Sequence, residues 1–350
     1  MNIYLEKQIF EDLILNAKEY PVWNSIFMNH SQIFLNLTDE ELMAEEIQGS
    51  IIFEFIKANG GRITYALKEF FDSIYEDNRV IANKPRSAFF LNYSKIEAEA
   101  IQSAFGVIVN GYEGIDDNIL KRAFFKELNK GAVFENETSK GWQNLVNFPL
   151  PPSNAMVITD EYLFANEESG FVVGVPNVIE LVNAFLPQNL NIPYHLTIIS
   201  NDHPEHSKPP KTKEWCEKIV NELKIGISAL RSYPILLEIV FTKTIHKRKL
   251  ILNYVNATCD KGFAVFNLSD GKTVRNDNDF RCDRVFTRTE PTEGDTDYKS
   301  AEIVLFQLKK KFQSVQEFIK NSKVKEIVNN RILGDYQTDK SIINRLLNDV

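Results

Sequence analysis

The segment Ala88–Asn110, AFFLNYSKIEAEAIQSAFGVIVN, carries the clearest succession of strand and helix signals in the sequence. The compact apolar run Ala88–Leu91 predicts a strand, and Ser94 is a suitable N-cap for the helix that follows. Gly106 is a natural helix stop, after which Val107–Asn110 predicts another strand. Strands joined by helices are typical of a parallel sheet, so this segment predicts an α/β fold.

The same alternation extends back to the N-terminus. The predicted elements are a strand at Asn2–Leu5, a helix at Gln8–Ala17, a strand at Gln32–Leu37, a helix at Asp39–Lys57 and a helix at Ile63–Tyr75. Thr38 and Glu41 have the spacing of a capping box at the start of one of these helices. We therefore expect residues 1–148 to form a parallel-sheet domain with Rossmann-like order.

A second domain is expected because the chain has 350 residues, against about 150 for an average domain. The boundary is predicted at Phe148–Ser153, where three prolines in four positions can continue neither a helix nor a central strand. Beyond it we predict strands at Ala155–Thr159, Tyr194–Ser200, Ile235–Thr242, Leu250–Val255 and Gly262–Asn267, and helices at Pro176–Phe185, Trp215–Leu223 and Tyr298–Asn321. The stretch Asp270–Asp297 is interpreted as a long surface excursion, and residues 323–350 as a polar C-terminal extension.

The composition is that of an ordinary globular protein, with 43% hydrophobic and 25% charged residues. No apolar run approaches the roughly 18 residues of a membrane span, and Glu6 interrupts the start where a signal peptide would be apolar. The three cysteines, Cys216, Cys259 and Cys282, have neither the even number of a disulfide framework nor metal-site spacing. These features predict a cytoplasmic protein without stable membrane insertion.

Charge is distributed unevenly along the chain. Residues 1–150 contain 14 Lys+Arg and 22 Asp+Glu, whereas residues 151–350 contain 26 of each. The acidic half would repel nucleic acid, so binding of a polyanion requires a local basic cluster in the second half.

Such a cluster follows the predicted strand Ile235–Thr242. His246 and Arg248 are two positions apart, and Asn253 lies five positions further on. A histidine nucleophile that attacks a phosphodiester needs a fixed cation to neutralise phosphate oxygens and a short polar group for orientation. We therefore predict His246 as nucleophile or phosphate ligand, Arg248 as phosphate clamp and Asn253 as orienting group. Additional phosphate contacts are predicted for Lys243, Lys247 and Lys249.

This cluster, followed by Gly262-Phe263-Ala264-Val265-Phe266, resembles the phospholipase D-like superfamily, especially its bacterial and MIT-associated C-terminal relatives. The segment Val157–Leu163, in which Asp160 ends a strand, resembles the start of those domains. The resemblance covers residues 153–322 and implies a phosphodiesterase or nuclease active on nucleic acid. It also implies a homodimer, because the chain has one H-x-R motif where the active site uses two histidine motifs. Similar domains occur in bacterial phage-defence and conflict systems, in which the partner would be nucleic acid or a protein of the same system.

The N-terminal half resembles PIN-like nuclease domains. The resemblance rests on Tyr4-Leu5-Glu6, on Glu41 or Glu45 in the following helix, and on the passage from Phe89 to Val107. It implies an acidic site for Mg²⁺ or Mn²⁺ that contains Glu6 with Glu41 or Glu45, and that is degenerate because Ser94 replaces the third carboxylate.

Three other interpretations remain open. In the first, both domains are inactivated nuclease-like modules that bind proteins or sense an anionic ligand without cofactors. In the second, the basic residues around His246 merely solvate a strand end, and the N-terminal acids form helix caps. In the third, the second domain binds lipid headgroups, although the sequence contains no basic amphipathic helix to support it.

Overall fold

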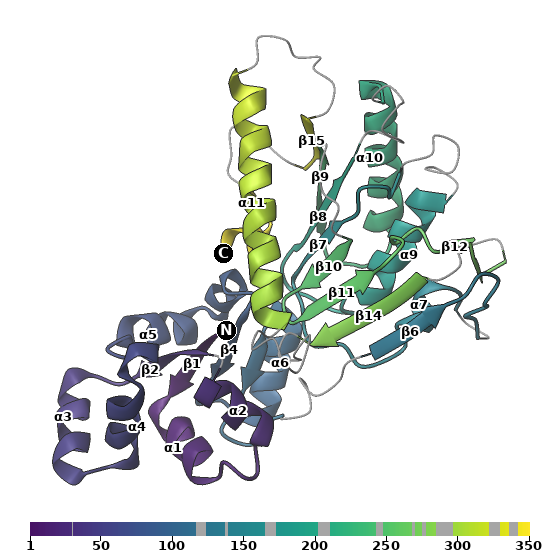
Figure 1. Cartoon of the computed structure of the whole chain (residues 1–350). Helices are drawn as coiled ribbons and strands as arrows, with labels where there is room; N and C mark the ends of the chain where they lie inside the picture. Colours follow the sequence, from purple (N-terminus) through teal and green to yellow (C-terminus); the bar gives the residue numbers. More distant parts are fainter. Residues whose placement is uncertain are drawn as a thin grey trace. The chain divides into compact units, whose positions relative to one another are not determined.

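The computed structural model describes residues 1–29, 31–116, 124–136, 139–164, 173–201, 211–242, 248–267, 270–274, 278–284, 297–321, 330–335 and 342–350 (Figure 1). The chain divides into two compact units, Met1–Arg122 and Ala123–Asn348. The division therefore precedes the proline-rich segment Phe148–Ser153, where we predicted it. In the described parts of the chain, no helix has the length and apolar character needed to cross a membrane.

The first unit is built on a sheet of five parallel strands in the order β3-β2-β1-β4-β5. The strands are β1 (Asn2–Glu6), β2 (Gln32–Asn36), β3 (Ile63–Thr64), β4 (Ser87–Phe90) and β5 (Ile108–Asn110). The helices are α1 (Lys7–Leu15), α2 (Pro21–Asn29), α3 (Asp39–Gln48), α4 (Ile51–Asn59), α5 (Lys68–Glu76) and α6 (Lys95–Phe105), with 3₁₀ turns η1 (Gly60–Arg62) and η2 (Asn78–Asn83). The predicted parallel α/β organisation of this unit is confirmed.

The strand order places a topological switch point between β1 and β4. From β1 the chain proceeds outward through β2 and β3, and then returns to the other side of β1 to form β4 and β5. The connections that leave β1 and β4 therefore diverge at the carboxyl ends of these two adjacent strands. In open α/β sheets this switch point is where ligands bind.

Two predicted helix caps are confirmed. Thr38 and Ser94 each form a capping box, with Glu41 and Glu97 respectively. The helix predicted over Asp39–Lys57 is instead two helices, because Gly49 adopts a left-handed conformation with φ 62° and ends α3.

The third predicted helix, Ile63–Tyr75, also differs from the structure. We predicted it to begin at Ile63, but Ile63 and Thr64 pair in parallel with β2, and α5 begins only at Lys68. Sheet pairing thus overrides the local helical pattern at its start.

The second unit contains an eight-stranded mixed sheet in the order β15-β9-β8-β7-β10-β11-β14-β6. These strands are β6 (Phe124–Leu128), β7 (Ala155–Thr159), β8 (Tyr194–Ser200), β9 (Ile235–Thr242), β10 (Lys249–Leu252), β11 (Val255–Cys259), β14 (Asn278–Arg284) and β15 (Asn330–Gly334), and the two-stranded sheet consists of β12 (Phe266–Asn267) and β13 (Lys272–Thr273). Strands β7, β8 and β9 are parallel, and the other neighbours pair antiparallel.

Helices cover both faces of this sheet (Figure 1). They are α7 (Trp142–Leu145), α9 (Val175–Phe185), α10 (Lys213–Ser228), α11 (Asp297–Asn321) and α12 (Arg345–Asn348). Alternate residues of β7 belong to two cores: Met156 and Ile158 pack with α9 and α10, whereas Ala155 and Val157 pack with α11 and α12. This alternation is the period of a strand that is buried on both faces.

Three predictions for the middle of this unit were wrong. The apolar run Leu250–Val255 is not one strand, because the chain turns at Asn253 and Tyr254 and pairs β10 with β11. The polar stretch Asp270–Asp297 contains β14, which pairs with β11 inside the sheet. Of the predicted strand Gly262–Asn267, only Phe266 and Asn267 are in strand conformation.

The described C-terminal residues, 330–335 and 342–350, are part of the fold, whereas we predicted a polar extension over residues 323–350. Strand β15 pairs antiparallel with β9, and Leu346 and Leu347 of α12 are fully buried. The Asn344 side chain donates hydrogen bonds to the Met156 carbonyl and to Thr197 Oγ1. The sequence did not predict these elements, because the segment is mostly polar and only its few apolar side chains reach the core.

Replacement of Leu346 by alanine tests this role of the C-terminus. Leu346→Ala should lower the free energy of unfolding by about 2 to 5 kcal/mol, because it leaves a cavity in a closed core. Ile225→Ala is the control, since Ile225 is 73% exposed on α10 of the same unit. Urea denaturation measures the free energy of unfolding of both variants. Equal, small losses would show that Leu346 does not contribute to the core of the second unit.

Glu238 on β9 also contacts the C-terminal segment, and its carboxyl group makes the stability of the second unit depend on pH. Its fully buried carboxylate accepts hydrogen bonds from Thr197 Oγ1 at 2.9 Å and from the Ile343 backbone at 3.2 Å. Burial nevertheless raises the pKa of Glu238 from 4.5 to about 7. Since the folded state binds this proton more tightly than the unfolded state, the stabilisation is complete below pH 4.5 and is lost as the pH rises through 7.

We expect Glu238→Gln to remove this part of the pH dependence. Between about pH 4.5 and 7 the free energy of unfolding of the native protein should fall by roughly 3 kcal/mol relative to that of the variant. Urea denaturation at several pH values provides the comparison. Parallel pH profiles of the two proteins would contradict the assignment.

Candidate functional site

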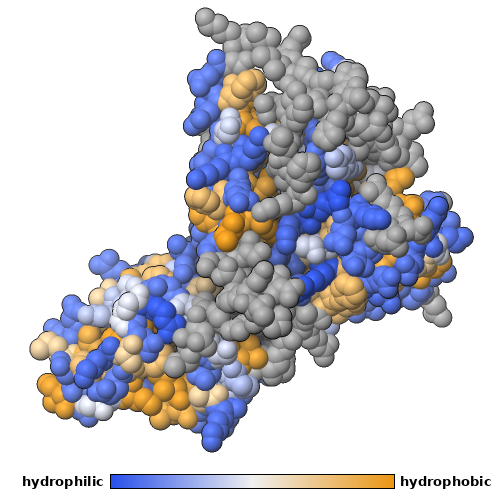
Figure 2. Space-filling view, in the orientation of Figure 1, coloured by the Kyte–Doolittle hydropathy of each residue, from blue (hydrophilic) through white to orange (hydrophobic). Residues whose placement is uncertain are grey.

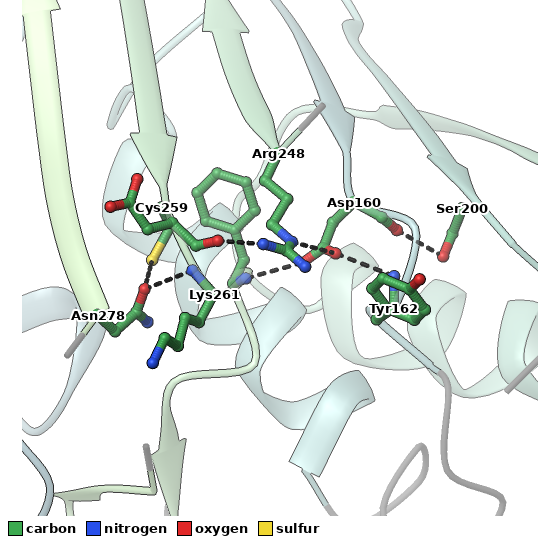
Figure 3. A network of polar contacts seen from close by, with 9 residues as sticks. Asp160, Tyr162, Ser200, Arg248, Cys259, Lys261 and Asn278 are labelled. Atoms are coloured by element: carbon green, nitrogen blue, oxygen red, sulfur yellow. Dashed lines mark hydrogen bonds and ion pairs between the residues drawn. The ribbon is translucent and has the colours of Figure 1, made fainter. Parts of the chain in front are cut away.

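Asp160 lies at the carboxyl edge of β7, directly after the strand, and is 1% exposed. Its Oδ1 accepts a hydrogen bond from the Tyr162 backbone at 3.0 Å, and its Oδ2 accepts one from the Phe263 backbone at 2.8 Å (Figure 3). Its carbonyl accepts from Ser200 Oγ, at the end of β8, at 2.8 Å. One buried aspartate thus joins β7, β8 and the loop that precedes β12.

Gly262 makes this arrangement possible. Its φ is 91°, and a Cβ atom at this position would lie 2.5 Å from Asp160 Oδ2. Only glycine permits both the backbone conformation and the close approach to the carboxylate. The two segments that the sequence singled out, around Asp160 and from Gly262 to Phe266, therefore meet in space.

Arg248 completes the cluster from the start of β10. Its Nε is 3.9 Å from Asp160 Oδ1, and its Nη1 donates to the Asp260 carbonyl (Figure 3). The guanidinium carbon lies 5.7 Å from the centre of the Tyr162 ring. The Arg248 side chain is 28% exposed, whereas that of Asp160 is 2% exposed. A buried carboxylate therefore holds a partly exposed cation at the edge of the sheet.

The same edge continues to β14 through Asn278. Asn278 Oδ1 accepts hydrogen bonds from the Lys261 backbone at 2.7 Å and from Cys259 Sγ at 3.4 Å. Burial raises the pKa of the Cys259 thiol, so this cysteine stays protonated and is not a nucleophile. These contacts fix the loop that supplies the Asp260 carbonyl to Arg248.

Not every predicted site residue lies in this cluster. Lys243, His246 and Lys247 lie outside the described residues, which stop at Thr242 and resume at Arg248. Lys249 pairs with Thr159 and alternates with Leu250, whose side chain packs in the core beneath α9 and α10. By this alternation Lys249 faces the side of the sheet that α11 covers, away from the contacts of Arg248.

Asn253 and Arg248 flank opposite ends of β10, so they lie at opposite ends of the sheet's strands. Lys249, next to Arg248, pairs with Thr159, whereas Leu252, next to Asn253, pairs with Met156 at the start of β7. The fully buried Asn253 accepts a hydrogen bond from the Asn154 backbone at 3.2 Å. The expectation that Asn253 orients the phosphate beside Arg248 is therefore replaced by a structural role in the β10–β11 turn.

The described residues contain one histidine, His195, and it does not supply a second catalytic imidazole. His195 is near the start of β8, opposite Ala155, at the amino edge of the parallel strands. Burial, together with the neighbouring Arg345, lowers the pKa of His195 to about 3. The imidazole is consequently neutral at physiological pH.

In the first unit, a cavity of about 460 Å³ opens at the carboxyl ends of β1 and β2. The lining residues are Glu6, Lys7, Gln8, Glu11, Asn36, Thr38, Glu41, Lys68 and Asn92. Glu6 is 5% exposed and accepts hydrogen bonds from Asn36 Nδ2 at 2.9 Å and from the Tyr75 hydroxyl at 2.6 Å. Burial and the hydrogen bond to Glu6 both raise the pKa of Tyr75, so its hydroxyl remains a donor.

The other predicted acids are engaged elsewhere. Glu41 lines the cavity, but its carboxylate accepts a hydrogen bond from the Thr38 backbone in the capping box. Glu45 does not line the cavity and forms an ion pair with Lys7. The hydrogen bonds with Lys7 and Ser50 lower the pKa of Glu45.

These residues do not form the divalent-metal site that the sequence suggested. Among the residues whose positions are described, no group of three or more His, Cys, Asp or Glu side chains is arranged to hold a metal ion. At the place of the third carboxylate, Ser94 caps α6 and bonds Glu97. Two-metal hydrolysis requires a tighter cluster of carboxylates than Glu6 and Glu41 provide.

The sequence did not single out Asn36 or Tyr75. Asn36 had a detectable signal, because it lies near the end of the predicted strand Gln32–Leu37, which pairs with the strand that ends at Glu6. Tyr75 had none, since its role depends on a contact between distant segments. Tyr162 lies in the segment Val157–Leu163 that carries the resemblance, but its contact with Arg248 depends on the fold.

Comparison with models of known protein families yields no match, and no curated protein matches the sequence. The resemblances described above therefore remain predictions.

Gly262→Ala tests the packing of the Asp160 cluster. The added methyl group should displace Asp160 Oδ2 and lower the free energy of unfolding by about 1 to 3 kcal/mol more than Gly131→Ala does. Gly131 is a matched control, because its φ of 81° is similar but its Cβ would meet nothing within 4 Å. Urea denaturation measures the difference, and equal losses would mean that backbone strain alone is responsible.

Proposed function

We propose that the second unit binds the phosphate groups of a nucleic acid at the carboxyl edge of β7, with Arg248 as the principal cation. The observation that carries this proposal is the position of the Arg248 guanidinium, which buried Asp160 and the Asp260 carbonyl hold at a partly exposed edge. A guanidinium that is already oriented loses little side-chain entropy when it binds an anion, and its planar shape suits two phosphate oxygens.

The remaining bonding capacity of Arg248 supports this role. Its Nε and Nη1 face Asp160 and the Asp260 carbonyl, whereas Nη2 has no acceptor in the described portion of the chain. The sequence places Lys243, His246 and Lys247 within the five residues before Arg248. These groups would add the positive charge that the ion pair with Asp160 removes.

Two features of the fold support the predicted family relationships. In the second unit, the two segments that resemble phospholipase D-like domains meet where the Phe263 backbone donates to Asp160, and Arg248 pairs with the same carboxylate. In the first unit, Glu6 is the last residue of the central strand of a parallel sheet, as the PIN-like resemblance implies. We propose both relationships on these grounds.

Cleavage would need a second imidazole. A histidine nucleophile requires a separate group to protonate the leaving oxygen. The only described histidine, His195, is at the other edge of the sheet. We therefore propose binding as the function of one chain, and cleavage only for a dimer in which two copies of His246 face the same phosphate.

Arg248→Gln should weaken binding of a fluorescein-labelled single-stranded oligonucleotide by roughly tenfold, because a charge-assisted contact is lost. Fluorescence anisotropy with DNA and RNA of the same sequence measures the affinity. Binding by the native protein should fall steeply between about 50 and 200 mM salt. Lys213→Gln is the control, since it removes one charge from an exposed ion pair on α10.

The outcome separates the alternatives. Absence of binding by the native protein, or equal affinity of Arg248→Gln and the native protein, would contradict the proposal. Loss of oligonucleotide cleavage in His246→Ala with retained binding would establish the dimeric enzyme. Binding without cleavage by either protein would establish the non-catalytic form.

One observation favours a non-catalytic role for the first unit. Both Glu6 oxygens are occupied by Asn36 and Tyr75, and no described cluster of acids completes a metal site. An inactivated nuclease-like unit that serves in protein interaction accounts for these contacts.

A further inference from the structure

Two helices stand out among the exposed apolar surfaces of the described residues. Large exposed hydrophobic side chains occur singly on several elements, but α3 and α11 each carry more than one. On α3, Met43 is 64% and Ile47 84% exposed, and on α11, Ile303 is 45% and Phe306 47% exposed. Figure 2 shows apolar side chains over both regions. Clustered apolar exposure of this kind marks an interaction surface.

Neither helix can bury these side chains by turning. Met43 and Ile47 are four residues apart and so share one face of α3. The buried residue of α3 is Glu45, which Lys7 pairs, so its rotation would break this ion pair. The opposite face of α11 already packs Val304, Leu305 and other residues against the sheet.

Charge excludes contact between two copies of α3. Its sequence, DEELMAEEIQ, contains five acidic residues and no lysine or arginine. The whole first unit, residues 1–122, carries 11 Lys+Arg and 19 Asp+Glu. Two such surfaces repel each other, so the partner surface must be both apolar and basic.

The exposed face of α11 has these two properties. Exposed Lys310 follows Phe306 by four residues and so shares its face, whereas Lys309, beside it, donates to the Val350 carbonyl. The Lys310 ammonium lies 4.3 Å from the centre of the Phe306 ring, so a cation borders the apolar surface. Long lysine side chains can cover apolar surface and still reach a carboxylate of a partner.

We propose that α3 of one molecule docks on α11 of a second copy of this chain, with Met43 and Ile47 against Ile303 and Phe306. The α3 carboxylates then face Lys310. This contact is independent of the phosphate-binding edge. The contact joins two different surfaces, so it is heterologous. Each copy therefore carries both surfaces, one on α3 and one on α11. Two copies either exchange both contacts in a closed dimer or extend into a longer assembly.

Analytical ultracentrifugation of the full chain over a range of concentrations tests the contact. The native protein should self-associate, and Ile47→Glu and Phe306→Glu should each raise the dissociation constant by at least about tenfold. Added salt should also weaken association, because the contact joins opposite charges. Ile96→Glu and Ile225→Glu are matched controls, since these residues are 79% and 73% exposed but lie outside the proposed contact.

Mixing the two variants identifies the pairing. The Ile47→Glu protein keeps an intact α11, and the Phe306→Glu protein keeps an intact α3, so an equimolar mixture should associate although neither protein does so alone. Circular dichroism establishes that both variants are folded. A monomeric native protein, association unaffected by either substitution, or a mixture that stays monomeric would each overturn the proposal.

Discussion

The buried carboxylate of Asp160 is the constraint on which the second unit depends. An aspartate that is 1% exposed must have its oxygens satisfied, and backbone donors from Tyr162 and Phe263 satisfy them. The same carboxylate holds Arg248 at the sheet edge. One group therefore determines the end of β7, the path of the loop through Gly262 and the presentation of the cation.

Both units place their polar groups at the carboxyl ends of parallel strands. In the first unit Glu6 is the last residue of β1, and in the second Asp160 follows β7. Each carboxylate is nearly buried and accepts two hydrogen bonds, both from distant segments for Glu6 and one from a distant segment for Asp160. The chemistry differs, because Glu6 lines an open polar cavity whereas Asp160 supports an arginine. The first arrangement is a polar cavity, and the second presents a partly exposed cation, which is the basis of the proposed phosphate binding.

Capping residues and regular apolar periodicity predicted helices correctly. Capping residues Thr38 and Ser94 and the long helix near Tyr298 behave as their sequences indicate. Errors arose where a run of one residue type concealed a turn, as at Gly49 within a helical pattern and Asn253 within an apolar one. The candidate site was predicted only in part, because Arg248 was found but Asn253 lies at the other edge.

The sequence by itself determined the α/β class and the acidic character of the first unit, because periodicity, capping and composition are local properties, whereas the family resemblance singled out the segments around Asp160 and Gly262. The tertiary structure decided which of these segments meet. It also decided that the C-terminal strand and helix close the second unit, and that Lys249 and Arg248 serve opposite faces. Strand register and order set these relations, and both depend on contacts between residues far apart in the chain.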